Sequence, residues 1–363
     1  MAGDYCKIFI NSTLVPGVLN VNIDDGRRNE TDPFRGGTAT FDYLQKFDGS
    51  PNIVPQIGDL VDITLYIAGG VEQFLFRGNI ADIDYLYNVA QINTYRVTVT
   101  DAISQIAQAE VSNVSVAPDY TGNQIKTLLT AAGISYPVGN IERGYSLCSG
   151  YTYTGNLLDQ INKITTTEQG ILLVDPSGVV AWKQRNVAIP PIISYSFSFT
   201  EGVQQYRYDQ VDVASAVQNR FNYVIVTPDG LASTPSSKPV VGAKKSLSVP
   251  TLDATTTQAG YLADYLWGMY SNADQDVQMV STTIEAQNIT VNKQTLATLQ
   301  LNTVVSVGYT PGTGGAGFII GRSISGTPSG TRFTYYLSGV SLQPFLRLDN
   351  VLQGKLDSGR LGF

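Results

Sequence analysis

The chain of 363 residues contains no histidine. This absence excludes a Ser-His-Asp or Cys-His nucleophile system, a histidine metal ligand and a histidine pH switch. Charged side chains are also scarce: they make up 15% of the residues, whereas about 25% is usual in soluble domains. Gly, Ser, Thr, Asn, Gln and 21 Tyr take their place. This mixture favours β-structure and uncharged polar surfaces of the kind that meet other subunits.

Long apolar runs and cysteine pairs are missing as well. No stretch approaches the ~18 apolar residues of a transmembrane helix, and the N-terminus lacks the order of a secretory signal, basic and then apolar. Cys6 and Cys148 are the only cysteines and follow no C-x-x-C spacing, which is typical of buried thiols in a protein made in reducing cytoplasm. The 23 basic and 30 acidic residues give a net charge of −7. This balance argues against a nucleic-acid binder, which needs a basic face.

Residues 1–110 have the alternation of half-buried strands. Val61, Ile63 and Leu65, for example, alternate with polar side chains, and Gly69-Gly70 predicts a hairpin turn. Six strands with turn signals between them favour a small antiparallel β-barrel or sandwich, which we expect as the first barrel domain, followed by a short helix. The strands are expected around residues 5–10, 18–23, 39–43, 61–67, 74–76 and 95–100, and the helix at 102–109.

Residues 111–199 have a different character and predict a small α+β middle domain. Thr121 is the expected cap of a helix that Gly133 ends. A second helix carries Leu157, Leu158, Ile161 and Ile164 on one face and stops by Gly170. Two apolar runs follow, joined by a Pro-Ser-Gly turn at 176–178.

Strand signals resume after residue 200. A second β-barrel is expected from 200–250 and 281–344, with a helical insertion at 251–280 that packs against the middle domain. The helix of this insertion has a stripe of Ala259, Leu262, Leu266 and Met269. The last expected strand changes phase at Gly339, which suggests a β-bulge. The fold class is therefore mainly β with an inserted α+β unit.

Several motifs could carry chemistry, and each has a simpler structural interpretation. Gly312–Gly317 matches G-x-G-x-x-G, but apolar residues of strand character follow it, so we interpret it as a loop between strands rather than a nucleotide site. The pairs Asp82/Asp84 and Asp274/Asp276 lack the surroundings of a calcium loop, so no metal or other cofactor is predicted.

A glycosidase needs two carboxylates and no histidine, so composition alone leaves this class open. Glu142, Glu168 and Glu201 are the candidates, and none lies in an aromatic-rich local motif. We therefore predict no enzyme. A host-receptor adhesin is a further alternative, because an uncharged surface rich in tyrosine suits carbohydrate contact.

At the level of the whole chain, the order of several segments resembles the baseplate-hub (tail-tip hub) family of phage minor tail proteins, as found in siphophages of actinobacteria. GRRNETDPFRGGTATFDY, IGDLVDITLY, FLFRGNIADIDY and YRVTVTDAISQIAQ resemble its N-terminal part. TGNQIKTLLTAAGI and residues 157–185 resemble its middle domain, and LDNVLQGKLDSGRLGF resembles its ending. Residues 45–49, Gln-Lys-Phe-Asp-Gly, depart from the Asn-x-Asp-Gly that relatives often have there.

The resemblance implies a non-catalytic homotrimer that closes the end of the tail tube. Two β-barrels per chain, linked by a helical and hairpin domain, would give a pseudo-sixfold ring. The implied partners are a hexameric distal tail ring, the tape measure protein and other minor tail proteins or fibres. DNA would meet the hub only in transit, and contact with the host surface would be indirect. The implied location is the virion tail tip, after synthesis and assembly in the bacterial host cytoplasm.

Two further expectations concern surfaces. The stretch 345–363 has apolar residues too widely spaced for a core of its own, and we expect it to be an extended arm that docks onto a neighbouring tail protein. We also expect the channel wall of the hub to be neutral or acidic, because basic walls would hold the passing DNA. The docking residues expected in the arm are Leu348, Val351, Leu352, Leu356, Leu361 and Phe363.

Overall fold

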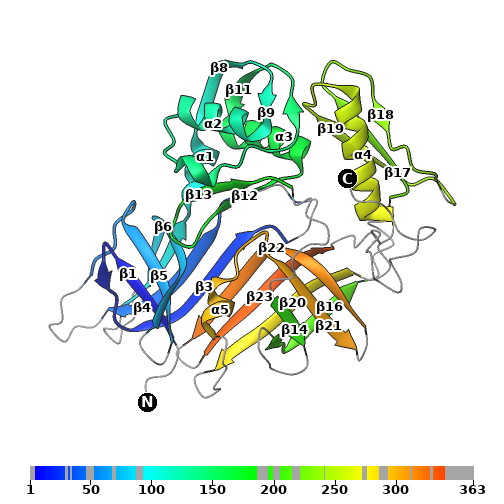
Figure 1. Ribbon diagram of the computed structural model, residues 1–363. Helices are drawn as coiled ribbons and strands as arrows, with labels where there is room; N and C mark the ends of the chain where they lie inside the picture. The colour runs from blue at the N-terminus through cyan, green and yellow to red at the C-terminus, as the bar shows by residue number, and fades with distance from the viewer. Residues whose placement is uncertain are drawn as a thin grey trace.

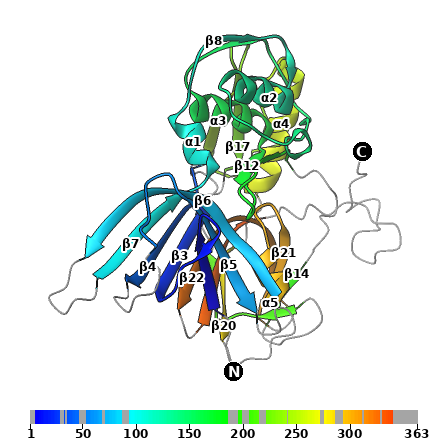
Figure 2. The same cartoon turned by 90° about the vertical axis from the view of Figure 1, so that its left-hand side faces the viewer.

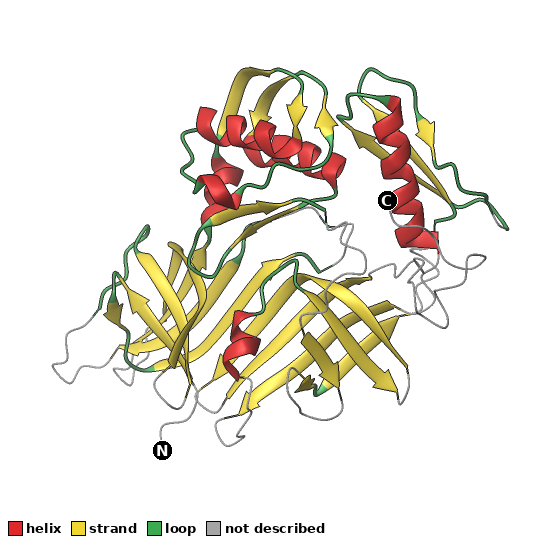
Figure 3. Cartoon of the chain, in the orientation of Figure 1, coloured by secondary structure: helices red, strands yellow, loops and turns green. Residues whose placement is uncertain are grey.

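The computed structural model consists of a large β-sheet with two smaller units on one side of it (Figures 1 and 2). Most helices belong to the smaller units (Figure 3). Among the described helices, none is long and apolar enough to cross a membrane. The structure describes residues 5–28, 32, 35–45, 53–67, 71–86, 93–185, 195–198, 205–214, 221–240, 242–271, 276–285, 293–310, 313–327 and 330–339.

The first strand block contains every strand that the alternating pattern predicts. Its strands pair in the order β3-β4-β7-β6-β5-β1-β2. Ile67 pairs with Val71 across the expected Gly69-Gly70 turn, which itself lies outside the described residues. The strands are β1 (Tyr5–Ile10), β2 (Thr13–Leu14), β3 (Val18–Gly26), β4 (Thr38–Gln45), β5 (Leu60–Ile67), β6 (Val71–Leu86) and β7 (Asn93–Thr100).

The second strand block joins the first through one long strand, β22 (Thr313–Thr327). The first half of β22 pairs with β21 (Val304–Thr310) and the second half pairs with β3. β23 (Gly330–Gly339) runs along its other edge. The remaining elements of this block are β14 (Tyr195–Ser198), β15 (Gln205–Arg207), β16 (Gln210–Ala214), β20 (Asp276–Glu285) and α5 (Lys293–Thr298).

The phase change expected after Gly339 falls on residues outside the described ones, and a separate irregularity lies in β22. The register between β22 and β23 shifts between Ile319 and Gly321, whereas Gly339 pairs regularly with Gly317. This is the point at which β22 exchanges β21 for β3 as its neighbour. A Cβ on Gly321 would lie 2.2 Å from the Arg27 carbonyl oxygen, so only glycine allows this close approach.

The sheet does not confirm the expectation of two small barrels. Among the described strands, both blocks end in unpaired edges and no pairing closes a barrel. The end strands fold back over the apolar face: Cys6 Sγ of β1 lies 3.7 Å from Thr331 Oγ1 of β23, and the rings of Phe197 and Tyr335 are 5.7 Å apart. One continuous hydrophobic core therefore serves both strand blocks.

A buried ion pair lies at the junction of β22 and β3. Arg322 Nε donates to Asp25 Oδ2 at 2.7 Å, and Arg322 Nη2 donates to the Leu75 carbonyl of β6 at 2.8 Å. The two charged side chains are 4% and 11% exposed. Burial raises the pKa of Asp25, while the charge of Arg322 and its hydrogen bond lower it. The pair connects both strand blocks at a point where both charged side chains are largely buried.

The middle unit, residues 101–185, has its own core and contains the predicted helices and hairpin. Asp101 caps the helix that opens it, since its carboxylate accepts from Ile103 N at 2.9 Å. Thr121 is not the cap that we expected: it is the first residue of the second helix, and its hydroxyl donates to Glu168. The elements are α1 (Ala102–Gln108), β8 (Glu110–Val116), β9 (Asp119–Tyr120), α2 (Thr121–Ala131), a 3-10 turn (Val138–Asn140), β10 (Leu147–Cys148), β11 (Tyr151–Asn156), α3 (Leu157–Glu168), β12 (Ile171–Val174) and β13 (Val180–Lys183).

A third unit, which we call the α4 unit, consists of α4 (Thr256–Ser271) on a small sheet of β17 (Tyr223–Pro228), β18 (Thr234–Pro235) and β19 (Ser246–Thr251). We expected residues 200–250 in the second barrel, but β17–β19 lie outside the large sheet, because Val224 and Val226 pack against Leu262 and Leu266 of α4. Conversely, Tyr195–Ser198, expected at the end of the middle domain, pair with β21.

Candidate functional site

The two candidate catalytic glutamates that the structure describes are occupied by structural contacts. Glu142 Oε1 lies 3.0 Å from Lys183 Nζ, and its Oε2 accepts from Gln184 N at 3.0 Å. Glu168 is fully buried, and its Oε2 accepts from Thr121 Oγ1, Tyr145 N and Ser146 N. These bonds hold the loop before β10 against α2 and α3. Glu201 lies outside the described residues.

The aspartate pair and the glycine motif have structural roles too. Asp82 and Asp84 lie in β6 opposite Thr98 and Arg96. Within the described residues, no group of three or more acidic or cysteine side chains could hold a metal ion. The motif residues from Thr313 to Gly317 belong to β22 and pair with β21, so they open no helix. Asp274 and the side chain of Asp276 lie outside the description.

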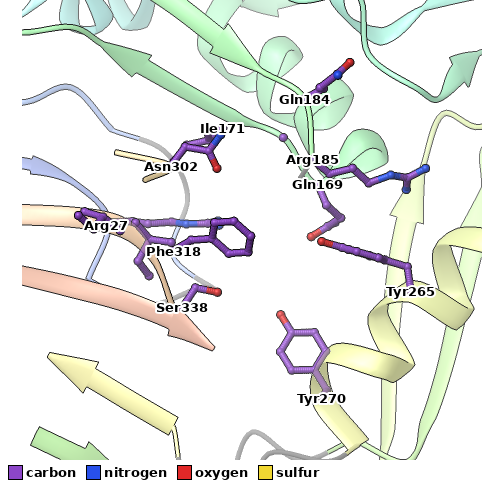
Figure 4. A pocket seen from close by; sticks show the side chains of 13 residues that line it. Arg27, Gln169, Ile171, Gln184, Arg185, Tyr265, Tyr270, Asn302, Phe318 and Ser338 are labelled. Atoms are coloured by element: carbon purple, nitrogen blue, oxygen red, sulfur yellow. The ribbon is translucent and has the colours of Figure 1, made fainter. Parts of the chain in front are cut away.

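A small cavity lies where the sheet, the middle unit and the α4 unit meet (Figure 4). Arg185 lines it at 14% exposure, with Nε 3.8 Å from Glu168 Oε1 and its guanidinium 5.5 Å from the Tyr265 ring centroid. The volume is about 60 Å³, far below the ~300–1,000 Å³ of small-molecule sites. We interpret this cavity as a packing junction between units.

Backbone hydrogen bonds also tie the α4 unit to the middle unit. Ser149 N donates to the Leu252 carbonyl at 2.8 Å, and Ala254 N donates to the Leu147 carbonyl at 2.9 Å. Leu252 N donates to Thr167 Oγ1 at 2.9 Å. The predicted contact between the helical insertion and the middle domain is therefore present, and the strand β19 takes part in it as well.

On one face of the large sheet, small polar side chains of neighbouring strands are aligned row by row. Ser325 of β22 lies opposite Asn22, Asn22 opposite Thr40, Thr40 opposite Thr98 and Thr98 opposite Asp82. The residues between them in each strand point to the core. We call the part of this surface that runs from β16 to the segment of β6 paired with β7 the polar face. Its described members are Asn20, Asn22, Asp24, Thr38, Thr40, Asp42, Asn79, Asp82, Asp84, Arg96, Thr98, Thr100, Gln210, Asp212, Ser323, Ser325, Arg332, Thr334 and Tyr336.

Aspartates outnumber arginines on the polar face: its described members include five aspartates, two arginines and no lysine. One row crosses four strands with Asn20, Asp42, Arg96 and Asp84 side by side. Arg96 Nε and Nη2 donate to the two carboxylate oxygens of Asp42 at 2.9 and 3.2 Å. These bonds, with that from Asn20, lower the pKa of Asp42 against the effect of burial, so the carboxyl group stays ionised.

The sequence did not single out the polar face as a site. The signal was present in the alternation of Thr, Asn and Asp with apolar residues along the strands. What was missing is the register, which aligns these residues across strands far apart in the chain. The expected docking residues Leu348, Val351, Leu352, Leu356, Leu361 and Phe363 lie outside the described residues.

The fold itself is that of phage tail proteins. The chain resembles a tail protein from Neisseria meningitidis (TM-score 0.65, 12% identity, 94% of this chain and 98% of that one). It also resembles a prophage 43 kDa tail protein from Shewanella oneidensis (TM-score 0.67, 13% identity, 93% and 99%). An Escherichia coli component of the type VI secretion system, described as similar to T4 phage tail proteins, is a more distant match (TM-score 0.54, 10% identity, 92% and 77%). No family model and no curated protein sequence matches the chain.

Proposed function

We propose that the chain is a structural virion protein that forms, as a homotrimer, the tail-tip (baseplate) hub of a phage tail. The observation that carries this proposal is the shared fold, which covers nearly the full length of this chain and of two phage tail proteins. The siphophage type, the tail-tip position and the trimer rest on the segment resemblance in the sequence. The hub would close the tail tube, connect the distal tail ring to host-recognition proteins and open for DNA passage, with the tape measure protein as a further partner.

The two strand blocks supply the six positions that a trimer needs under a hexameric ring. Each block contributes seven strands to the sheet. The strand β22 joins the two blocks, because it pairs first with β21 of its own block and then with β3 of the other block. Each block would take the place of one barrel in a pseudo-sixfold ring. The buried Arg322–Asp25 pair would then fix the angle between the two positions within one chain.

We further propose that the polar face lines the channel through which DNA leaves. A duplex carries one negative charge per ~1.7 Å of its axis, and lysine or arginine clusters bind it by releasing counterions. The polar face offers mainly hydroxyl, amide and carboxylate groups. A net charge of −7 per chain also disfavours DNA retention. Such a wall lets a duplex pass without holding it.

The stretch 345–363 would dock onto a neighbouring tail protein. Its six expected docking residues could each contribute about 1.5–3 kcal/mol on burial, before the entropy of ordering the segment is subtracted. A truncation at Pro344 should therefore leave the chain folded but give incomplete, non-infectious tails. Complete, infectious tails from the truncated chain would refute the docking role.

No observation favours a separate catalytic function, since Glu142 and Glu168 are held by an ion pair and by buried hydrogen bonds. The copy number in purified virions tests the hub directly. Quantitative mass spectrometry should give three copies of this chain for every six of the distal tail protein. Six copies, or one copy per peripheral fibre, would contradict the trimer.

A further inference from the structure

Three arginines on or beside the polar face, Arg96, Arg28 and Arg332, are each engaged by a neighbouring group. Arg96 binds Asp42 through both oxygens and faces Asp84 on its other side. Arg28, just after β3, donates to Asp24 Oδ2 at 2.7 Å and lies over the Tyr336 ring. The third arginine, Arg332 in β23, has a neutral partner, Gln210.

The side-chain amide of Gln210 lies between Arg332 and Asp212 and bonds to both. Its Nη2 donates to Gln210 Oε1 at 3.2 Å, and Gln210 Nε2 donates to Asp212 Oδ1 at 3.1 Å. Gln210 lies in β16, one strand beyond β20, so the arginine side chain bridges across a strand to meet it. Arg332 is therefore held by one hydrogen bond, whereas Arg96 is held by two to a charged group.

These contacts occupy the groups that would bind phosphate. A guanidinium binds phosphate through the same pair of parallel N–H donors that it offers to a carboxylate. In Arg96, Nε and Nη2 already point at Asp42. The side chains of Arg28 and Asp24 are 54% and 33% exposed, and exposed pairs of this kind contribute only about 0–1 kcal/mol to stability. Arg96 is 53% exposed, whereas its partner Asp42 is 11% exposed. Stability alone therefore gives a weak reason for pairing Arg28, and the exposed guanidinium of Arg96 would reach phosphates if Asp42 did not occupy it.

We propose that Asp42, Asp84 and Asp24 are screening residues, which keep Arg96 and Arg28 from binding the phosphates of a passing DNA duplex. This inference rests on the proposed function, because it takes the polar face to be the surface that DNA passes. It adds that specific pairings, besides the average charge, keep DNA from binding to this face. Arg332, with a neutral partner, is then the strongest remaining contact for phosphate.

The test measures the binding of a short fluorescent DNA duplex by anisotropy over a range of salt concentrations. The wild-type chain should bind weakly and with a shallow salt dependence. Asp42→Asn should bind the duplex more tightly at low salt. For each freed arginine that reaches a phosphate, the negative slope of log binding constant against log salt concentration should become steeper by about 0.9. Arg332→Gln should lower the residual binding of the wild-type chain.

Two matched variants separate screening from a general change of charge. Asp82→Asn removes the same charge from the same face but lies opposite Thr98, so it should bind DNA no more tightly than the wild type does. Asp42→Asn combined with Arg96→Gln should lose the binding gained by Asp42→Asn alone. Equal binding by the Asp42 and Asp82 variants, or gained binding that persists without Arg96, would overturn the proposal.

Asp42 is buried and also accepts from Asn20, so its variant is accompanied by two milder ones. Asp84→Asn changes an exposed residue, and Asp24→Asn frees Arg28 from an exposed pair. Both variants should bind DNA more tightly than the wild type but less tightly than Asp42→Asn, and their circular dichroism spectra should be unchanged. This test uses the isolated chain, so a virion copy number other than three would refute the hub while leaving the screening result standing.

Discussion

Removal of the Arg322 side chain should cost more stability than that of any exposed arginine. In Arg322→Met, Asp25 would remain in a site where it is 11% exposed, without its cation and without the hydrogen bond of 2.7 Å. Loss of one partner of a buried pair typically costs about 3–5 kcal/mol. We expect a decrease of this size in the free energy of unfolding, measured by urea denaturation with far-UV circular dichroism.

The defect should also depend on pH. Burial raises the pKa of Asp25, and Arg322 is the main influence that lowers it. Without Arg322, the carboxyl group can escape its penalty by taking up a proton, so the defect should be smaller at about pH 5 than at about pH 8. Replacement of both partners, as in Asp25→Leu with Arg322→Met, should recover much of the lost stability.

Arg332→Met is the matched control, because this arginine lies in the adjacent strand β23 but is exposed on the polar face. Its cost should stay within about 0.5 kcal/mol. Hydrogen exchange should locate the weakening produced by Arg322→Met in β3 and β22. Equal midpoints for the wild type and Arg322→Met would refute the account of the junction between the strand blocks.

Three further predictions concern the smaller units and the pH response. Glu168→Gln should destabilise the middle unit by about 1–3 kcal/mol in urea denaturation followed by the fluorescence of its buried tryptophan, since the charge that accepts three hydrogen bonds is lost. Gly122→Ala should also lower the denaturation midpoint, because its Cβ would lie 1.7 Å from a carbonyl oxygen, whereas Gly139→Ala, with open space around it, should be nearly neutral. Burial raises the pKa of Asp101 to about 7 and of Asp253 to about 6, both above the ~3.9 of unfolded aspartate. The folded state therefore holds these protons more tightly, and the thermal midpoint should rise as the pH falls from about 8 towards 5; a midpoint that falls over this range would contradict the assignment.

The sequence predicted most of the elements and less of their assembly. The alternation of apolar and polar residues was sufficient to predict the strands of the first block. The apolar stripe of Leu157, Leu158, Ile161 and Ile164 was sufficient to predict α3. The prediction that Thr121 caps α2 was wrong, because the Thr121 hydroxyl donates its hydrogen bond to the distant Glu168. Local pattern contains no information on such a contact between residues far apart in the chain.

The assignment of strands to sheets failed for the same reason. The alternation of β17 resembles that of a large-sheet strand, yet Val224 and Val226 face α4. The pairing of β22 with β3 joins residues about 300 positions apart, and it determines both the single core and the polar face. Polar alternation was visible in each strand separately, but its alignment into one surface depends on this pairing.

The central claim is that three copies of this chain surround a channel with their polar faces turned inward. Electron cryomicroscopy of intact tail tips tests it most directly, since the map gives both the symmetry and the orientation of the sheet. The account predicts threefold symmetry, with Thr40, Thr98 and Ser325 facing the lumen and no ring of unpaired lysine or arginine there. A sixfold or peripheral arrangement, or a polar face buried against another protein, would contradict it.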